Sequence, residues 1–549
     1  MSKIDCRVAA AAVNSTVGDF HGNAHKILEA VAAARAKGAD LLVFPELCLC
    51  GYNPRELLNV PAFMEKELQE LDRLVSKISG LVAVVGFAEM FEGRLYNSAA
   101  VIADGRIVTI ARKKHLLNQG FINEPRYFNA GTGAAYFKIG SLSFKVLINE
   151  DLYYEEGPSL ASALCVCGAQ PFYKAAFDHT PTLLSYHSQQ QQASLIYANT
   201  VGGNDESVFS GEACVYEADG TLLACTAAFE EQQTIADLTL ISKDLTDAPA
   251  ALPVTRPKTE AVVSKLCQRE NENRRIVKAL VIGLQDYVRK CAFSRVLVGL
   301  SGGVDSSLTA CLAVLALGAE NVKGVLMPSR FNSSTASEDA LYLSKQLGIE
   351  YQTVSIEPIL QTYQAVLSPE LKEDSLARQN VQARIRGNIL MALANAHHYL
   401  VLVTSNKSEV FAGYSTLYGD AAGALAPLKD ITKGLLYELC LEVNDMLGTS
   451  VINQSVLSKA PSAELAYDQK DSDCLPPYDQ LDRIVQHFLT DKSLEHNADI
   501  LYQETARKWY GTFLNSEYKL RQLPLGLSIT PFSLNNNRQV PVAKSWPNI

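Results

Sequence analysis

The feature that most constrains this 549-residue chain is an apolar strand that leads directly into a glycine-containing loop and a helix. Val296–Leu300 is continuously apolar, and Ser301-Gly302-Gly303-Val304-Asp305-Ser306 follows it at the start of a helical pattern over Val304–Leu317. Glycine lets the backbone approach a ligand closely, and a helix N-terminus presents unpaired N–H groups to an anion. The arrangement predicts a phosphate-binding loop, which is not a Walker A loop because no lysine follows. A Ser- or Asp-capped helix start is the alternative.

Strands and helices alternate around this loop. The patterns predict helices over residues 271–289 and 337–347, and strands over residues 322–327 and 351–356. This spacing is typical of βαβ units in a doubly wound parallel sheet. In such a sheet, ligands bind at the carboxyl ends of the strands, where the glycine loop begins.

The loop resembles that of the PP-loop ATP pyrophosphatases, which cleave ATP between the α- and β-phosphates. Later stretches resemble motifs of the NAD synthetases within that group: QNVQARIR at 379–386, TSNKSE at 404–409, GYSTLYGD at 413–420, KAPSAEL at 459–465 and EYK at 517–519. The resemblance covers residues 271 to about 526. A GMP synthetase-like ligase fits the loop alone, but the stretch at 379–386 argues against it.

The resemblance to NAD synthetases implies a reaction: ATP adenylylates the carboxylate of deamido-NAD, pyrophosphate leaves, and ammonia attacks. It implies ATP contacts at Gly299, Leu300, Ser301, Gly302, Gly303, Val304, Asp305, Ser306, Thr404, Lys433 and Ser462. It also implies deamido-NAD contacts at Asn380, Glu409 and Lys519. Mg²⁺ prefers carboxylate and phosphate oxygens, and Asp305 and Glu409 are the implied metal ligands. Helix capping by Asp305 and a solvated helix face for Glu409 are the alternatives.

Three predicted strands of the first half end in polar residues: Glu46 follows one, Lys113 another and Asn149 a third. Helices separate some strands, and hairpin signals at Asp104-Gly105 and Asp219-Gly220 separate others, which suggests a mixed-sheet α/β structure. In this order, the three strand ends resemble the Glu–Lys–Cys set of the nitrilase superfamily. That resemblance, over residues 1 to about 244, implies an αββα sandwich that hydrolyses glutamine. Glu46 is then the general base, and Lys113 stabilises the tetrahedral intermediate.

Position 149 departs from that pattern, because asparagine stands where the superfamily has its cysteine nucleophile. An amide nitrogen cannot form the thioester that a thiolate forms. The glutamine pocket departs as well: Gln119 replaces a tyrosine, Gln170 a serine, and Ala176 a basic residue. We therefore expect an inactive glutaminase domain and free ammonia as the nitrogen donor. The alternatives are a glutamine-using enzyme in which asparagine has replaced Cys at position 149, and a catalytically silent nucleotide-binding scaffold.

Composition supports an ordinary globular protein, with 48% hydrophobic and 20% charged residues. The formal charge of −10 argues against nucleic-acid or anionic-membrane partners, which require a basic face. The twelve cysteines lack zinc-ligand spacing, so we expect buried free thiols in a reducing, cytoplasmic compartment. We expect domains over residues 1–244 and 269–549, joined by an aperiodic proline-containing linker over 245–268. The nitrilase resemblance implies a homo-oligomer.

Overall fold

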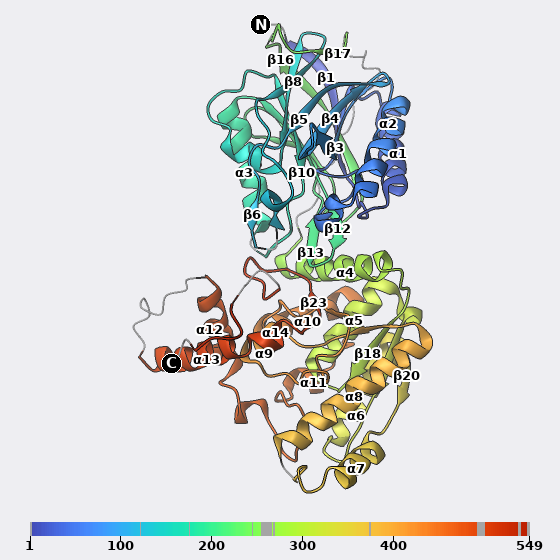
Figure 1. Ribbon diagram of the computed structural model, residues 1–549, viewed down its shortest axis with the longest axis vertical. Helices are drawn as coiled ribbons and strands as arrows, with labels where there is room; N and C mark the ends of the chain where they lie inside the picture. Colours follow the sequence, from blue (N-terminus) through green and yellow to red (C-terminus); the bar gives the residue numbers. More distant parts are fainter. Residues whose placement is uncertain are drawn as a thin grey trace. The chain divides into compact units, whose positions relative to one another are not determined.

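The computed structural model describes residues 3–120, 122–174, 176–243, 245–253, 266, 270–372, 375–490, 500–535 and 540–545 (Figure 1). The chain divides into two units, Met1–Glu270 and Asn271–Ile549. Each unit has its own sheets and core. Among the described residues, no helix is long and apolar enough to cross a membrane.

The first unit contains two facing sheets, in agreement with the expected sandwich. The first sheet has the order β16 (Gln232–Ile241), β1 (Lys3–Ala12), β2 (Leu41–Val43), β3 (Val82–Phe91), β4 (Arg94–Ala103) and β5 (Arg106–Arg112). The second has the order β15 (Leu222–Cys225), β14 (Cys214–Tyr216), β11 (Ser194–Asn199), β10 (Ala163–Gly168), β9 (Leu142–Ile148), β8 (Ala135–Ile139) and β17 (Ala250–Leu252). Both hairpin signals lie where expected, between β4 and β5 and between β14 and β15.

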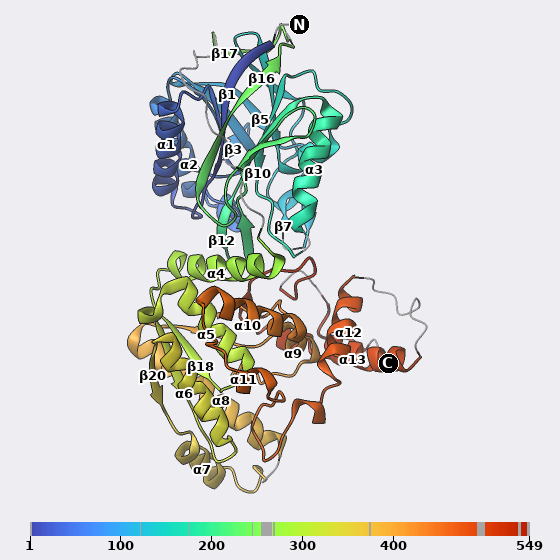
Figure 2. The ribbon, with the colours of Figure 1, turned by 180° about the vertical axis from the view of Figure 1, so that it is seen from behind.

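Helices cover the outer faces of the two sheets. Helices α1 (Phe20–Ala36) and α2 (Pro61–Lys77) pack on the first sheet, and α3 (Ala176–Gln191) packs on the second (Figures 1 and 2). Central strands are therefore buried on both faces, which explains their continuous apolar runs. The resulting αββα layers confirm the architecture that the nitrilase resemblance implied.

The expected linker is not entirely without secondary structure. Residues 254–265 and 267–269 lie outside the described residues, but β17 forms within the predicted linker. It pairs in parallel with β8 at the edge of the second sheet. A three-residue strand is too short to produce a detectable alternation in the sequence, so periodicity could not reveal it.

The second unit has one parallel sheet, with the order β20 (Glu350–Thr353), β19 (Val322–Leu326), β18 (Val296–Leu300), β21 (Leu400–Leu402), β22 (Leu425–Ala426) and β23 (Leu525–Gly526). The chain adds β19 and β20 on one side of β18 and then crosses to β21 on the other side. This reversal is the topological switch point, where open α/β sheets bind ligands. The predicted doubly wound sheet is confirmed.

The helices of the second unit pack around this sheet and position the loops at its carboxyl edge. They include α4 (Glu272–Lys290), α5 (Val304–Leu317), α6 (Ser334–Leu347), α8 (Leu376–His397), α9 (Lys407–Ala412), α10 (Lys433–Leu447), α12 (Tyr478–Thr490) and α13 (Ile500–Asn515). Helix α6 begins three residues before the predicted start, because Ser333 caps it by accepting a hydrogen bond from Ala336 N–H. A separate apolar cluster joins α9, α12 and α13.

Candidate active site

The glycine loop after β18 has the form expected of an anion site. Gly302 has a φ of +76°, and a Cβ at this position would lie 2.0 Å from the carbonyl oxygen of Ala336. Gly303 is the N-cap of α5, and no side chain makes a capping hydrogen bond there. Ser306 Oγ lies beneath the loop, where it accepts a 3.3 Å hydrogen bond from Ser301 N–H. The N–H groups of the first turn of α5 are thus left without a side-chain cap.

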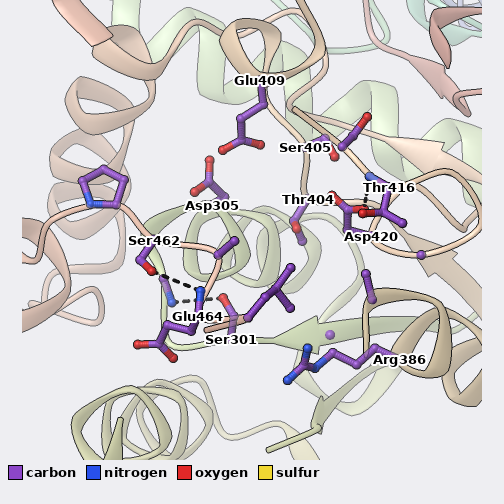
Figure 3. Close-up of a pocket in the computed structure, with 18 of the residues that line it drawn as sticks. Ser301, Asp305, Arg386, Thr404, Ser405, Glu409, Thr416, Asp420, Ser462 and Glu464 are labelled. Atoms are coloured by element: carbon purple, nitrogen blue, oxygen red, sulfur yellow. Dashed lines mark hydrogen bonds between the residues drawn. The ribbon is translucent and has the colours of Figure 1, made fainter. Parts of the chain in front are cut away.

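Asp305 does not cap its helix, so the alternative interpretation of this residue is wrong. Its Oδ1 accepts a 2.7 Å hydrogen bond from Asn406 Nδ2, and its Oδ2 lies 2.6 Å from Lys433 Nζ. The same lysine nitrogen lies 3.4 Å from Glu409 Oε1. Asp305 and Glu409 point toward one another across the pocket (Figure 3). The Lys433 ammonium therefore forms ion pairs with two carboxylates, one from α5 and one from α9.

Glu409 is held by the start of its own helix and is not a solvated surface residue. Asn406 and Glu409 form a capping box, in which each side chain accepts a hydrogen bond from the other residue's backbone N–H. Burial and repulsion by Asp305 raise the pKa of Glu409 to about 8, although Lys433 opposes this shift. Burial lowers the pKa of Lys433, but the attraction of Asp305 and Glu409 is larger and raises it overall.

The paired carboxylates fit a divalent cation. Oxygen ligands from two carboxylates, with the remaining positions filled by phosphates and water, are typical of Mg²⁺ sites that serve nucleotides. Lys433 Nζ now lies against both Asp305 and Glu409. The carboxylate oxygens of Asp305 and Glu409 are therefore ligands of the kind that Mg²⁺, the metal implied by the sequence, prefers.

These groups line one pocket of about 590 Å³ at the carboxyl edge of the sheet. Of the residues implied by the resemblance, the lining includes Gly299, Leu300, Ser301, Gly303, Val304, Asp305, Asn380, Thr404, Glu409, Lys433, Ser462 and Lys519. Gly302 and Ser306 are buried behind the loop and are not among the lining residues. The structure thus brings residues from five separate motifs into one cavity.

Two of the implied contacts are engaged within the protein. Ser462 Oγ donates a 2.6 Å hydrogen bond to Gln469 O and accepts one of 3.0 Å from Glu464 N–H. Lys519 Nζ donates hydrogen bonds of 2.8 Å to Gly413 O and Ser415 O. Both residues therefore shape the pocket wall, and their side chains have to exchange partners to contact a ligand.

Sequence reasoning did not single out several polar residues of the pocket. Arg386 lies within the quoted motif at 379–386, and burial lowers the pKa of this guanidinium to about 10. Burial raises the pKa of Asp420 to about 6. Glu464 accepts hydrogen bonds from Asn332 and Ser333. All three residues belong to quoted motifs, but only the folded chain shows that they line the same pocket.

The strand ends of the first unit also converge, around Lys113. Its Nζ lies 2.7 Å from Glu46 Oε1, 2.8 Å from Glu124 Oε1 and 2.5 Å from Glu150 Oε2. Asn97 Nδ2 donates a further 2.6 Å hydrogen bond to Glu46. Burial, with repulsion by Glu124 and Glu150, raises the pKa of Glu46 well above its usual range, although Lys113 opposes the shift. Glu46 is thereby held toward its protonated form.

Glu124 and Glu150 were not anticipated from the sequence. Glu150 follows Asn149 directly, but Glu124 comes from a separate turn, Glu124–Arg126. The three carboxylates could hold a metal ion by their spacing alone. Lys113 takes that position instead, because its ammonium already lies against all three.

Asn149 follows β9 directly and has a left-handed backbone conformation, with a φ of +40°. Its side chain is buried, and Nδ2 donates a 2.7 Å hydrogen bond to Glu150 Oε1. Asparagine tolerates this backbone region better than most residues do. The side chain thus lies beside the lysine–carboxylate cluster, but it carries no thiol.

The other three positions at which this chain differs from the family's glutamine pocket lie on separate elements. Gln119 is exposed on a short hairpin of β6 (Asn118–Gln119) and β7 (Ile122–Asn123). Gln170 is held by its backbone N–H, which donates a 2.8 Å hydrogen bond to Asn199 Oδ1. Ala176 begins α3, and its side chain lies outside the described residues.

Comparison with known proteins assigns both units to families. Residues 276–524 match the NAD synthase family, and residues 7–243 match the carbon–nitrogen hydrolase family. The chain is 36% identical to a glutamine-dependent NAD(+) synthetase of Synechocystis sp., and the alignment covers 98% of this chain and 99% of the relative. The chain belongs to the two-domain NAD synthetase family. NAD synthetases are ligases that form a carbon–nitrogen bond, and this chain is therefore placed among the amide-forming ligases.

Other NAD synthetases agree in both sequence and fold. The relative from Thermotoga maritima, also named a glutamine-dependent NAD(+) synthetase, is 36% identical over 98% of this chain and 99% of its own length. The solved structure of the glutamine-dependent NAD+ synthetase from Acinetobacter baumannii, in complex with ADP, is 30% identical. It covers 99% of both chains with a TM-score of 0.76. The NAD synthetase of Cytophaga hutchinsonii, at 19% identity and a TM-score of 0.82, shares the fold.

Proposed function

We propose that this chain converts deamido-NAD to NAD, using ATP to adenylylate the substrate carboxylate and releasing AMP and pyrophosphate. The observation that carries the proposal is the shared pocket, in which the glycine loop, Asp305 and Glu409 lie with Asn380 and Lys519. Its volume of about 590 Å³ is within the range of small-molecule sites. The relative from A. baumannii was solved with ADP, which supports nucleotide binding in this family.

We propose a role for each part of the pocket. The uncapped N–H groups at the start of α5 would hold the pyrophosphate of ATP. Asp305 and Glu409 would hold Mg²⁺, which neutralises phosphate charge when bound. Lys433, which is buried and contacts both carboxylates, would place a positive charge beside the leaving pyrophosphate. Asn380, whose Oδ1 accepts a hydrogen bond from Thr416, and Lys519 would hold deamido-NAD.

The nitrogen donor depends on the first unit. The names of the relatives favour glutamine over free ammonia, since these proteins are called glutamine-dependent. Asn149 is incompatible with glutamine hydrolysis by the family's cysteine mechanism, because asparagine supplies no thiolate to attack an amide carbonyl. For the chain with Asn149, we propose free ammonia as the donor; the glutamine-using alternative applies to a chain with cysteine there. The surrounding Glu46, Lys113 and Glu124 are in place in either case.

Formation of NAD from deamido-NAD, ATP and Mg²⁺ tests both parts of the proposal. Glutamine freed of ammonia and ammonium chloride are supplied in separate reactions, and AMP, pyrophosphate and NAD are measured together. We expect turnover with ammonium alone. Turnover of the unaltered chain with glutamine would contradict the proposed donor, and failure with both donors would contradict the ligase assignment.

Substitution at position 149 makes the donor test specific. Asn149→Cys restores a thiol at the end of β9, and Asn149→Ala is the matched control that removes the amide without adding a nucleophile. Glutamine-dependent turnover in the cysteine variant alone would show that residue 149 decides the donor. Its absence would show that positions such as Gln119 and Gln170 also prevent glutamine hydrolysis. Ammonium-dependent turnover should be equal in all three proteins.

A further inference from the structure

The cysteines of this chain differ from the expectation of uniformly buried thiols. All eleven cysteines that the structure describes are thiols, and Cys291 and Cys474 are exposed; Cys267 lies outside the described residues. Two other cysteines stand opposite each other on neighbouring strands. Cys214 on β14 and Cys225 on β15 are register partners in an antiparallel pair.

The hydrogen-bond pattern places this pair where cross-strand side chains approach most closely. Thr226 N–H donates a 2.9 Å hydrogen bond to Ala213 O, and Ala213 N–H donates a 3.0 Å hydrogen bond to Thr226 Oγ1, so residues 213 and 226 are hydrogen-bonded beside the cysteine pair. Cys214 and Cys225 therefore occupy the adjacent non-hydrogen-bonded position, at which Cα atoms lie about 4.5 Å apart. Disulfides span Cα separations of about 4.4–6.8 Å, so the strands can carry one without moving apart.

Both thiols lie on the same face of the second sheet. Cys214 is buried in the apolar cluster under α3, and Cys225 packs against that cluster while remaining half-buried. Burial and the neighbouring Cys225 raise the pKa of the Cys214 thiol. Because Cys225 is more exposed than Cys214, an oxidant reaches Cys225 first.

We propose that Cys214 and Cys225 form a reversible disulfide when the protein meets a low-molecular-weight disulfide such as oxidised glutathione. The Cys225 thiolate attacks one sulfur of oxidised glutathione and releases one glutathione thiol. Cys214 then loses its proton and attacks the Cys225 sulfur, which releases the second glutathione. Two protein thiols become one disulfide, and the two electrons and two protons reside in two molecules of reduced glutathione. Reduced glutathione in excess reverses both steps.

The first test uses the full chain at graded ratios of oxidised to reduced glutathione. Free thiols are blocked with N-ethylmaleimide, and the protein is digested without reduction for mass spectrometry. We expect a cross-linked peptide pair that contains Cys214 and Cys225 and disappears after reduction. A stable glutathione adduct on Cys225, or unmodified Cys214 and Cys225 under conditions that modify exposed Cys474, would overturn the proposal.

Single substitutions identify the order of the two steps. Cys225→Ser should leave Cys214 unmodified, whereas Cys214→Ser should retain glutathione on Cys225 because no second thiol resolves the adduct. Cys474→Ser is the matched control, and it should form the cross-link at the same ratio as the unaltered chain. Equal glutathionylation of Cys214 in the Cys225→Ser variant would contradict the proposed order.

Thermal unfolding provides a second readout that does not depend on peptide recovery. The disulfide closes a short loop around the β14–β15 hairpin and restricts the unfolded chain. The first unit should therefore unfold at a higher temperature after oxidation, and the shift should be absent in both single-serine variants. A shift that persists in those variants would assign the effect to other cysteines.

Discussion

Lys433 Nζ lies 2.6 Å from Asp305 Oδ2, although 128 residues separate the two in sequence. Glu409 Oε1 lies 3.4 Å from the same nitrogen. The lysine is the first residue of α10, and the carboxylates lie in the first turns of α5 and α9, so three helix N-termini meet at one ammonium. The structure thus shows that the two carboxylates implied as metal ligands are already paired with a protein cation.

Substitution of that lysine tests its contribution to nucleotide binding. Lys433→Met leaves Asp305 and Glu409 without their shared counter-charge. Hydrogen bonds to charged groups contribute about 1.5–3 kcal/mol, so we expect kcat/KM for ATP to fall roughly 10- to 100-fold. Steady-state kinetics with varied ATP measure this. Lys345→Met, on the exposed face of α6, is the control and should behave as the unaltered chain; an unchanged KM and kcat in Lys433→Met would contradict the role.

The phosphate loop depends on glycine at position 302 for space as well as for its backbone conformation. In Gly302→Ala, the new Cβ would lie 2.0 Å from Ala336 O, so the loop has to move. A displacement of about 1 Å at a reacting group costs on the order of 100-fold in rate, and we expect a loss of that size in NAD formation.

A second glycine separates this clash from backbone strain. Gly348 also has a positive φ, +68°, but a Cβ there would meet no atom within 4 Å. Gly348→Ala should therefore lower the unfolding free energy by about 1–2 kcal/mol and leave ATP kinetics unchanged. Equal kinetic losses in the two variants would show that strain, and not the clash, explains the effect.

Glu464 joins the loop over residues 459–465 to the start of α6. Its carboxylate accepts hydrogen bonds from Asn332 Nδ2 at 2.9 Å, Lys459 Nζ at 2.9 Å and Ser333 Oγ at 3.1 Å. Burial opposes ionisation, but these hydrogen bonds outweigh it and lower the pKa of Glu464. This loop carries Ser462 and lines the pocket.

Removal of that carboxylate should loosen the loop. We expect Glu464→Ala to raise KM for ATP about tenfold, on the scale of one charged hydrogen bond, and to speed amide hydrogen exchange over residues 459–465. Glu464→Gln, which keeps an acceptor oxygen, should show a smaller change. Glu338→Ala, at an exposed position of α6, is the control. Unaltered exchange in Glu464→Ala would mean that other contacts hold the loop.

The first unit should lose stability as the pH rises, because of Glu67 on α2. Burial raises the pKa of this carboxyl to about 8, against a usual value of about 4.3. Between these values the folded state holds a proton that the unfolded chain releases. The unfolding free energy therefore falls as the pH rises from about 4.3 to 8, by up to about 1.4 kcal/mol per pH unit.

Glu67→Gln removes this titration and keeps the acceptor that receives Ala88 N–H. We expect the variant to be more stable than the unaltered chain at pH 8 and equal to it near pH 4.5, as measured by thermal unfolding across that range. Glu65→Gln, at an exposed position of the same helix, should show no such divergence. A stability difference that is constant with pH would contradict the raised pKa.

Much of the fold could be predicted from local pattern. The strand–loop–helix around Ser301–Ser306 and the βαβ spacing after it predicted the parallel sheet, because each element has its own periodicity. Both Asp-Gly hairpins also appeared where the turn residues indicated. The strand β17 escaped prediction, since its three residues pair through sheet position and not through a sequence pattern.

The candidate site was predicted less completely. The motifs identified Asp305, Glu409 and Lys433 as separate contacts, but not as one ion-paired cluster. The contacts of Glu124 and Glu150 with Lys113 were not predicted, because the sequence around a glutamate in a turn does not indicate that its side chain is buried.

The sequence alone determined the chemical groups available and the local elements that carry them. It established the glycine loop, the order of strands and helices, and the missing thiol at position 149, since these are properties of residue identity and short-range spacing. Tertiary structure decided which charges and thiols meet. The crossing of the chain from β20 to β21 brings α5, α9 and α10 together at Lys433. The antiparallel register sets Cys214 against Cys225, because cross-strand pairing depends on contacts that no single segment contains.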